Sequence, residues 1–350
     1  MPWRSGAGAR PAQASRPRTH DIRTALVLLA LAGLALATYL VADAGWAAVL
    51  EAIAVVGWGL VPVTAFHLFP LAFSMLSWRE MVPAASRPSA GLLLWNRYIR
   101  ESINSLLPVG QVGGDLVSVQ LLHRWGTPGP AAAASMVTDL TVGLVTQLMF
   151  VFAGLVALLA VSTDPGVRMV AGTVLAGLAV LALMAGAFVA AQRRGMFALI
   201  GRVAGGLIRD ERVVRIAGHG VRIDAAVHAV YADRAGLARA VLWRLTGWIA
   251  GTGEVWLLMH FLGKPITPAE AFILESFGAG LRAAAFLVPG AIGVLEAGFV
   301  VFGALFGITA SDALLIALGK RVRELALGVP GLVAWQLGEG RRLFGRQPAR

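Results

Sequence analysis

The chain has 350 residues, of which 57% are hydrophobic and only 14% are charged, and its net charge is +11. Soluble domains carry about 25% charged residues, so this composition excludes a water-soluble protein and predicts a membrane protein. Most basic residues fall in the loops between the apolar runs, as they do in membrane proteins whose cytoplasmic loops are basic. The positive net charge is therefore attributed to membrane topology, and no nucleic acid partner is expected.

Long apolar runs predict an all-α polytopic fold, because backbone groups inside a bilayer must hydrogen-bond to one another. Residues 1–23 are polar and rich in Pro, Ala and Arg, which predicts a disordered basic N-terminus. The first apolar run, residues 24–41, is long for a signal peptide and is interpreted as a span, with cleavage as the alternative. The second run, residues 52–76, contains Pro62 and Pro70, which predict kinks.

The first broken segment, residues 98–122, follows a basic stretch at residues 79–100. Its centre has the sequence LPVGQVGGD at positions 107–115. One membrane crossing needs about 20 residues, so two crossings do not fit in this segment. We therefore predict a re-entrant hairpin, in which two half-helices meet at the Pro/Gly turn.

Further spans are predicted at residues 131–161, 167–191, 240–262 and 313–337, with a second broken segment at residues 269–306. The loop at residues 193–239 is rich in arginine. Within it, apolar side chains recur at helical spacing and predict an amphipathic helix on the membrane surface. These side chains are Phe197, Ile200, Val203, Ala204, Leu207 and Ile208.

The loops differ in charge between the two sides of the membrane, and basic loops mark the cytoplasmic side. The N-terminus, residues 79–100, residues 193–239 and the tail at 341–350 are rich in arginine, whereas the opposite loops contain only Lys264. Both termini are therefore predicted to be cytoplasmic, in a bacterial-type inner membrane. Residues 24–340 are predicted to form one domain of about six transmembrane helices plus two re-entrant helical hairpins. If the second broken segment crosses fully twice, the count becomes eight and the orientation is unchanged.

An internal repeat connects the two broken segments. Proline, an acid and a later charged residue have the same spacing in both halves, namely Pro108, Asp115 and Asp139, and Pro289, Glu296 and Lys320. By the predicted topology, the two hairpins enter from opposite sides. That arrangement is an inverted repeat, which is typical of transporters whose binding site lies near the bilayer midplane.

Polar side chains at membrane depth are costly, so they are the candidates for a substrate-binding cavity. The candidates are Glu101, Asn104, Gln111, Asp115, Asp139, Glu275, Arg282, Glu296, Lys320, Arg321 and Glu324. Asp115 and Glu296 would face the cavity and bind a cationic head group, a proton or a coupling cation. The alternative is that each caps the N-terminus of a half-helix.

Each of the other candidates also has a purely structural alternative. Arg282 would clamp a phosphate or carboxylate, or form a salt bridge with Glu275 or Glu296. Glu275 and Arg282 are seven residues apart and are expected to share one helix face. Glu101 and the preceding Arg100 would instead lie at the membrane interface.

The span at residues 313–337 contains a charge cluster that should partly neutralise itself, because Arg321 and Lys320 lie three and four residues before Glu324. Asp139 would either pair with this cluster or contact substrate. Glu254 is a further candidate for the cavity. His67 is interpreted as a packed, hydrogen-bonded residue rather than as a ligand.

Motifs of known enzymes are absent from the sequence: it contains no HExxH, Walker A or GxSxG pattern. It also contains no cysteine, which excludes thiolate zinc sites, iron–sulfur clusters and disulfides. We therefore expect neither an enzyme, nor a cofactor, nor a bound metal.

Residues 101–122 and 286–302, followed by the charged span, resemble the membrane domain of lysylphosphatidylglycerol synthases and the wider flippase-like family. The stretch NSLLPVGQVGGD at positions 104–115 is most similar to the branch associated with hopanoid biosynthesis. The resemblance covers residues 24–340 and implies a lipid-translocating scaffold with two re-entrant hairpins.

Two departures from the family limit what the resemblance implies. The synthases continue into an aminoacyl-transfer domain, whereas this chain ends shortly after the last span, so synthase activity is not expected. The family's usual arginine in the span after the first hairpin is replaced by Thr138-Asp139-Leu140. Anionic head-group binding by that span is therefore not carried over.

The leading hypothesis is transport of a lipid or polyisoprenoid through a polar cavity between the hairpins. A hopanoid is one candidate substrate. Asp115, Arg282, Glu296, Arg321 and Glu324 would line this cavity. The expected partners are a membrane lipid substrate and the bilayer, and the oligomeric state is left open. The alternative is an accessory protein that recruits lipid-synthesis enzymes through residues 193–239, and a membrane-embedded transferase is a third hypothesis without a motif.

Overall fold

The computed structural model describes residues 53–107, 113–162, 165–207, 211–285, 291 and 293–344. All the regular elements in these ranges are helices. Several predicted features lie outside the described residues: the N-terminus at 1–23, the span at 24–41, Gln111, both turn prolines Pro108 and Pro289, and Ile208.

The first described rod is a helix with an interruption. It consists of η1 (Gly57–Gly59), α3 (Leu60–Phe66) and α4 (Leu68–Met81). The interruption is at His67, three residues before Pro70. Because proline has no N–H, Pro70 cannot bond to the carbonyl of Phe66, which weakens the helix at this point.

Next in the chain are two short helices, α5 (Ala90–Leu106) and α6 (Gly113–Arg124), which pack against each other. The amide of Gly114 donates a hydrogen bond to the Asn104 side-chain oxygen, 2.8 Å away. A Cβ atom at Gly114 would lie 2.4 Å from the Arg100 carbonyl oxygen. Glycine is therefore required for α5 and α6 to approach this closely.

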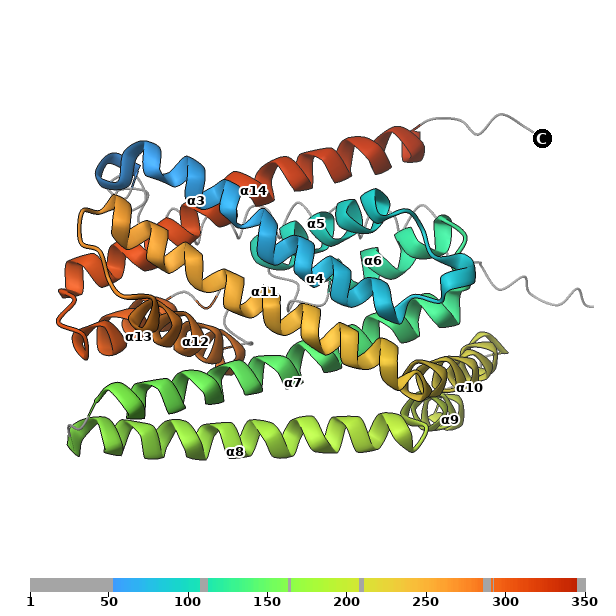
Figure 1. Ribbon diagram of the computed structural model, residues 1–350. Coiled ribbons are helices and arrows are strands. Elements are labelled where there is room, and N and C mark those ends of the chain that lie inside the picture. Colours follow the sequence, from blue (N-terminus) through green and yellow to red (C-terminus); the bar gives the residue numbers. More distant parts are fainter. Residues whose placement is uncertain are drawn as a thin grey trace, which may run out of the picture.

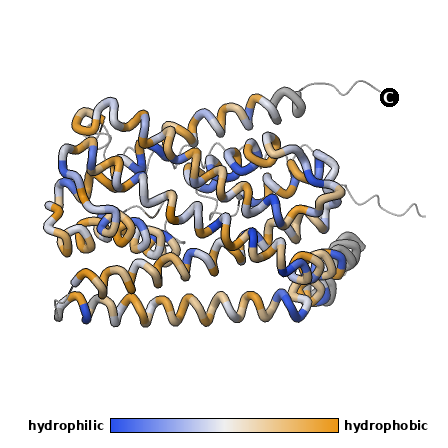
Figure 2. Tube along the Cα trace, viewed as in Figure 1, coloured by the Kyte–Doolittle hydropathy of each residue, from blue (hydrophilic) through white to orange (hydrophobic). Residues whose placement is uncertain are grey.

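Two long apolar helices follow, α7 (Gly129–Val161) and α8 (Pro165–Arg193), and they pack side by side (Figure 1). In the described part of the chain, three helices are long and apolar enough to cross a membrane: Ile53–Met81, Gly129–Val161 and Gly166–Arg193. Between its ends α8 is almost entirely apolar, whereas α5, α11 and α14 carry polar residues along their lengths (Figure 2).

The arginine-rich loop is a pair of helices, α9 (Met196–Leu207) and α10 (Glu211–Ala232), that pack against each other. Asp224 of α10 accepts hydrogen bonds from the amides of Phe197 and Ala198, at 3.2 and 2.7 Å, and so caps α9. The sequence predicts a helix in this region but not its partner. Part of the predicted apolar face is exposed, at Ile200 and Val203, and so is the neighbouring Leu199.

The second half of the chain contains α11 (Arg234–Phe261), α12 (Pro268–Ala284), α13 (Val294–Ala304) and α14 (Ala310–Phe344). A capping box between Thr267 and Glu270 starts α12, and Asp233 caps α11. The spans predicted at residues 240–262 and 313–337 correspond to α11 and α14, although both helices contain too many charges to count as purely apolar.

The two halves have matching helix lengths. The rod Ile53–Met81, α5, α6 and α7 have 29, 17, 12 and 33 residues. The helices α11, α12, α13 and α14 have 28, 17, 11 and 35 residues. The positions of the short helices are therefore the same in both series.

Packing between the halves is reciprocal. The α5 helix packs against α14, α12 packs against α7, and α4 packs against α11. The α5–α6 pair and the α12–α13 pair lie toward opposite ends of the long helices (Figure 1). Each short pair thus contacts the long helix of the other half, which brings the charged residues of both halves together.

Close approach at these two contacts depends on glycine. A Cβ atom at Gly154 of α7 would lie 1.7 Å from the Ser276 hydroxyl of α12, and one at Gly331 of α14 would lie 2.1 Å from the Ser102 hydroxyl of α5. Small residues allow this kind of helix approach in membranes. The serines of the two halves are thus packed in the same way.

We predict that Gly154→Ala lowers the free energy of unfolding by about 1–3 kcal/mol, because the added methyl group forces α7 and α12 apart. Gly172→Ala in α8 is the matched control, since its Cβ would meet nothing within 4 Å. Thermal unfolding of the purified protein in detergent would compare the two variants. Equal melting temperatures would contradict close packing of α7 on α12.

Candidate functional site

A buried carboxylate, Asp139, is the centre of the first charged cluster. It is 0% exposed. Arg97 and Arg100 of α5 contact its Oδ2 atom at 2.8 and 2.5 Å, and Arg244 of α11 bonds to its Oδ1 atom. Arg100 also bonds to Asp115 of α6. We call these five residues the α7 network, and it connects four helices.

The α7 network differs from the sequence predictions in two ways. Asp139 pairs with arginines of α5 and α11, and not with the charge cluster of α14 as one alternative proposed. Arg100 is 7% exposed and pairs with two carboxylates inside the protein, a contact that the sequence analysis does not predict. A single carboxylate can hold three arginines because its burial removes competing water and each arginine forms a charge-assisted hydrogen bond with it.

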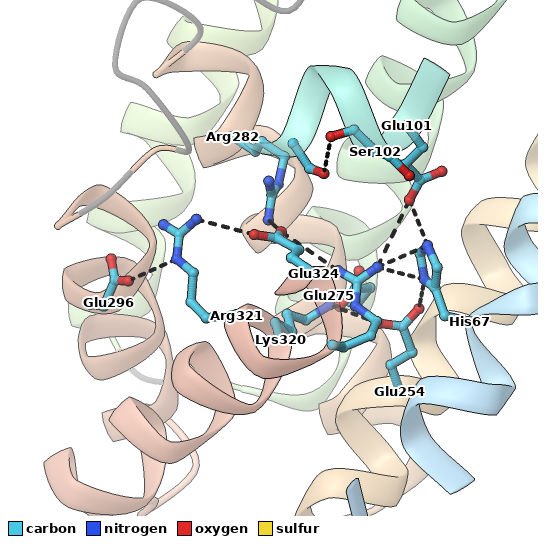
Figure 3. A network of polar contacts seen from close by, with 12 residues as sticks. His67, Glu101, Ser102, Glu254, Glu275, Arg282, Glu296, Lys320, Arg321 and Glu324 are labelled. Carbon is cyan, nitrogen blue, oxygen red and sulfur yellow. Dashed lines mark hydrogen bonds and ion pairs between the residues drawn. The ribbon is translucent and has the colours of Figure 1, made fainter. Parts of the chain in front are cut away.

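A second and larger cluster surrounds the charged turn of α14, and Figure 3 shows most of its members. We call it the α14 network. Its ionisable side chains come from the α3–α4 junction and from α5, α11, α12, α13 and α14. They are His67, Glu101, Glu254, Glu275, Arg282, Glu296, Lys320, Arg321, Arg323 and Glu324.

Glu324 and Arg321 of α14 contact the two short helices of the second half. Arg282 of α12 lies 2.8 Å from the Oε1 atom of Glu324, and Arg321 lies 3.2 Å from its Oε2 atom. Arg321 also lies 3.5 Å from Glu296 of α13. The predicted pair of Arg321 with Glu324 is confirmed. The alternative in which Arg282 pairs with Glu275 or Glu296 is wrong, because Arg282 reaches Glu324 instead.

Lys320 points to the other side of the cluster. Its Nζ atom lies 2.6 Å from Glu275 of α12 and 3.8 Å from Glu254 of α11. The predicted pairing of Lys320 with Glu324 is therefore not observed, because two other carboxylates approach Lys320. Glu275 and Arg282 both contact α14, as expected for two residues on one face of α12.

His67 lies between two carboxylates (Figure 3). Its Nε2 atom lies 2.6 Å from Glu101 of α5, and its Nδ1 atom lies 2.5 Å from Glu254 of α11. Arg323 of α14 is 2.7 Å from the same imidazole and 3.4 Å from Glu254. His67 is therefore packed and hydrogen-bonded, as predicted, but it also belongs to the charged cluster.

The remaining candidates have clear structural roles. Asp115 and Glu296 each lie in the first turn of their helices, α6 and α13, where a carboxylate is favoured by the helix dipole. Their side chains nevertheless bind arginines, Arg100 and Arg321. Asn104 holds α6 against α5 through the amide of Gly114.

Exposure separates the two networks. Asp139 is fully buried, whereas the side chains of Glu101, Arg282, Glu296 and Arg321 are 40, 33, 20 and 17% exposed. Within the ranges that the structure describes, Oε2 of Glu296 and Nη2 of Arg321 are buried and have no hydrogen-bond partner. Charged atoms of this kind are costly unless a ligand or water binds them. The α14 network therefore contains unpaired charged atoms and is partly exposed.

Two cavities, of about 280 and 210 Å³, lie elsewhere. They are lined by residues around the α11–α12 and α13–α14 loops, such as Ile266, Thr309, Glu270 and Phe306. No residue of either network lines them. In the described part of the chain, no group of three or more His, Asp or Glu residues is arranged to hold a metal ion.

Comparison with known proteins gives one match. The model of a protein family described as the lysylphosphatidylglycerol synthase TM region matches residues 24–331. This range includes every residue of both networks. No curated protein and no solved structure matches the chain.

Proposed function

We propose that this chain, which belongs to the family of the lysylphosphatidylglycerol synthase TM region, moves the polar head group of a lipid across its membrane. The family and the apolar helices indicate a membrane protein of lipid metabolism. The observation that carries the proposal is the α14 network: ten ionisable side chains, several of them partly exposed, gather inside the helical bundle. Charges at membrane depth are retained where function needs them.

The proposed topology is six transmembrane helices with two re-entrant hairpins in an inverted repeat. The helices α5, α6, α12 and α13 have 17, 12, 17 and 11 residues. Each is shorter than the roughly 20 residues that a crossing needs, which supports half-helices. The reciprocal packing of the two halves supports the inverted repeat. The arginine-rich loops support an inner-membrane protein with cytoplasmic termini.

The head group would bind at the corner formed by Arg282, Glu296 and Arg321. Arg282 and Arg321 could hold a phosphate, and Glu296 an amine, which suits a zwitterionic or phosphate-bearing head group. The apolar tail would stay in the lipid beside α13. A polyisoprenoid phosphate fits this chemistry, and a hopanoid with a polar head group is a second candidate substrate.

The α7 network would not bind the head group. Its three arginines are already paired with Asp139, which is fully buried. An anionic ligand would have to displace a carboxylate that is hydrogen-bonded on both oxygens. The α7 network thus supports a structural role, in which it holds α5 and α6 against α7 and α11.

A head-group accessibility assay would test the proposal. The purified protein is reconstituted in vesicles that contain fluorescent phosphatidylethanolamine, phosphatidylglycerol or undecaprenyl phosphate, and dithionite then quenches the outer leaflet. We expect the protein to speed up the loss of inner-leaflet fluorescence for at least one of these probes. Rates equal to those of protein-free vesicles with every probe would contradict transport.

The second candidate function is recruitment of lipid-synthesis enzymes by the α9–α10 pair. The exposed apolar side chains Leu199, Ile200 and Val203 favour it. Deletion of residues 196–232 would then abolish lipid modification in cells, while Arg282→Ala would leave it unchanged. The opposite result would support transport. Neither function includes a chemical step performed by this chain.

A further inference from the structure

We propose that three arginines at one end of the α4–α11 pair, Arg79, Arg87 and Arg239, form a binding site for the phosphate of an anionic phospholipid. The site shares no residue with either network, and its lipid stays bound at the surface of the bundle. The inference therefore goes beyond the proposed function, and its test measures binding and not lipid movement.

The three arginines lie at one end of two neighbouring helices. Arg79 is in the last turn of α4, Arg87 follows the short helix η2 (Ala84–Ser86), and Arg239 is in the second turn of α11. The α4 and α11 helices pack against each other, and these ends lie on the same side of the bundle as the α9–α10 pair (Figure 1). The basic loops predict that this side is cytoplasmic, where the leaflet carries anionic lipids.

One carboxylate, that of Glu80, lies among these arginines. Its Oε2 atom is 2.9 Å from Nε of Arg239, and its Oε1 atom is 3.7 Å from Nη1 of Arg79. Arg87 donates instead to the carbonyl oxygen of Val82, from Nε at 3.0 Å and from Nη2 at 2.8 Å. Three guanidinium groups therefore share a single carboxylate, and two positive charges of the cluster are not balanced.

The charges around Arg87 show that the three arginines act on one another. The pKa of Arg87 lies below its ordinary value, first because the side chain is partly buried and then because Arg79 is close. Arg239 also lowers this pKa, whereas Glu80 raises it. A bound anion would compensate the positive charges that crowd together here.

Two of the arginines are open to a ligand. The side chains of Arg239 and Arg79 are 55 and 39% exposed. Among the described residues, Arg239 contacts Glu80 through Nε and Arg79 contacts it through Nη1, so each guanidinium keeps other N–H groups for a ligand. Arginine binds phosphate oxygens through parallel N–H groups, so this cluster suits a phosphate.

An apolar surface continues from the arginines along the bundle. Leu242 and Ile249 follow Arg239 on the same face of α11 and are 64 and 56% exposed. Beside them, Phe73 of α4 stacks on Trp243 of α11, with 5.9 Å between the ring centroids. A phosphate on the arginines would therefore have an apolar surface next to it for acyl chains, which favours a phospholipid over a free phosphate.

Native mass spectrometry of the full chain in detergent would test this inference, with phosphatidylglycerol as the anionic probe and phosphatidylcholine as the zwitterionic one. In Arg79→Gln/Arg239→Gln we expect the affinity for phosphatidylglycerol to fall about tenfold or more, and that for phosphatidylcholine to stay the same. Arg202→Gln/Arg222→Gln is the matched control, because it removes two exposed arginines from α9 and α10. Both variants keep the α14 network, so binding there contributes equally. An equal loss in the control would overturn the site.

Glu80→Gln keeps the test decisive if the double arginine variant does not fold. The carboxylate of Glu80 competes with a bound phosphate for Arg79 and Arg239, so its neutralisation should raise the affinity for phosphatidylglycerol several-fold. An unchanged or lower affinity would overturn the inference. Inorganic phosphate in large excess should not displace the lipid, and displacement would overturn the assignment to a phospholipid. The rate of head-group movement has no bearing on these results.

Discussion

Replacement of Asp139 with asparagine should lower the free energy of unfolding by about 3–5 kcal/mol, the cost of leaving a buried ion pair without one partner. The carboxylate of Asp139 binds Arg97, Arg100 and Arg244 and is 0% exposed. Asparagine keeps the size of the side chain but supplies only one acceptor atom and no charge. Arg97 and Arg244 would then lose the carboxylate that they contact, and Arg100 would keep only Asp115.

Thermal unfolding in detergent and the yield of monodisperse protein would measure this effect. Arg239→Gln is the matched control, since Arg239 forms an ion pair with Glu80 but is 55% exposed. Exposed pairs contribute only about 0–1 kcal/mol. If Asp139→Asn were as stable as Arg239→Gln, the α7 network would not be the structural element that we describe.

The helices of this fold could be predicted from the sequence better than their contacts. The spans at residues 131–161 and 167–191 correspond to α7 and α8, because length and apolar composition are local properties. The short helices of the first broken segment were predicted because that segment is too short for two membrane crossings. The helices that pack against α9 and α5 could not be predicted, because contacts between distant segments produce no pattern in a single sequence.

The candidate site was predicted in part. Sequence reasoning found Arg282, Arg321 and Glu324, which lie in clearly apolar surroundings. It missed Arg97, Arg100 and Arg244, which lie near the ends of predicted segments and resemble ordinary interface arginines. A signal was present: Arg97, Arg100 and Asn104 recur at intervals of three and four residues, which places them on one face of α5.

His67 shows the limit of the sequence most clearly. A lone histidine in an apolar run is usually a packed core residue, and nothing near it in the sequence is charged. Its carboxylate partners lie 34 and 187 residues away. Only the fold brings them together.

A second large effect is expected at Glu324. We predict that Glu324→Gln lowers the rate of head-group movement by about tenfold or more and the free energy of unfolding by about 2–3 kcal/mol. Arg282, Arg321 and Arg323 all contact this carboxylate, at 2.8, 3.2 and 3.6 Å. Without its charge, α12 loses the ion pair of Arg282 with α14, and Arg321, which contacts Glu296 of α13, loses one of its two carboxylate partners.

The measurement combines thermal unfolding with the head-group accessibility assay. Glu270→Gln is the control, because Glu270 is a partly exposed carboxylate outside both networks, with hydrogen bonds to Thr267 in the capping box of α12. It should cost about 1 kcal/mol or less and leave the transport rate unchanged. Normal transport by Glu324→Gln would show that the α14 network is not part of the path.

The most direct test of the central claim is the transport rate of Arg282→Ala. Arg282 is 33% exposed and, among the described residues, forms one ion pair, with Glu324, which keeps Arg321 and Arg323 as partners. The variant should therefore fold normally and melt within a few degrees of the wild type. In vesicles in which the wild type moves a fluorescent lipid, we expect Arg282→Ala to move it about tenfold more slowly or worse, and Glu296→Ala to behave similarly. Wild-type rates in both variants would contradict the claim that the head group crosses at the α14 network.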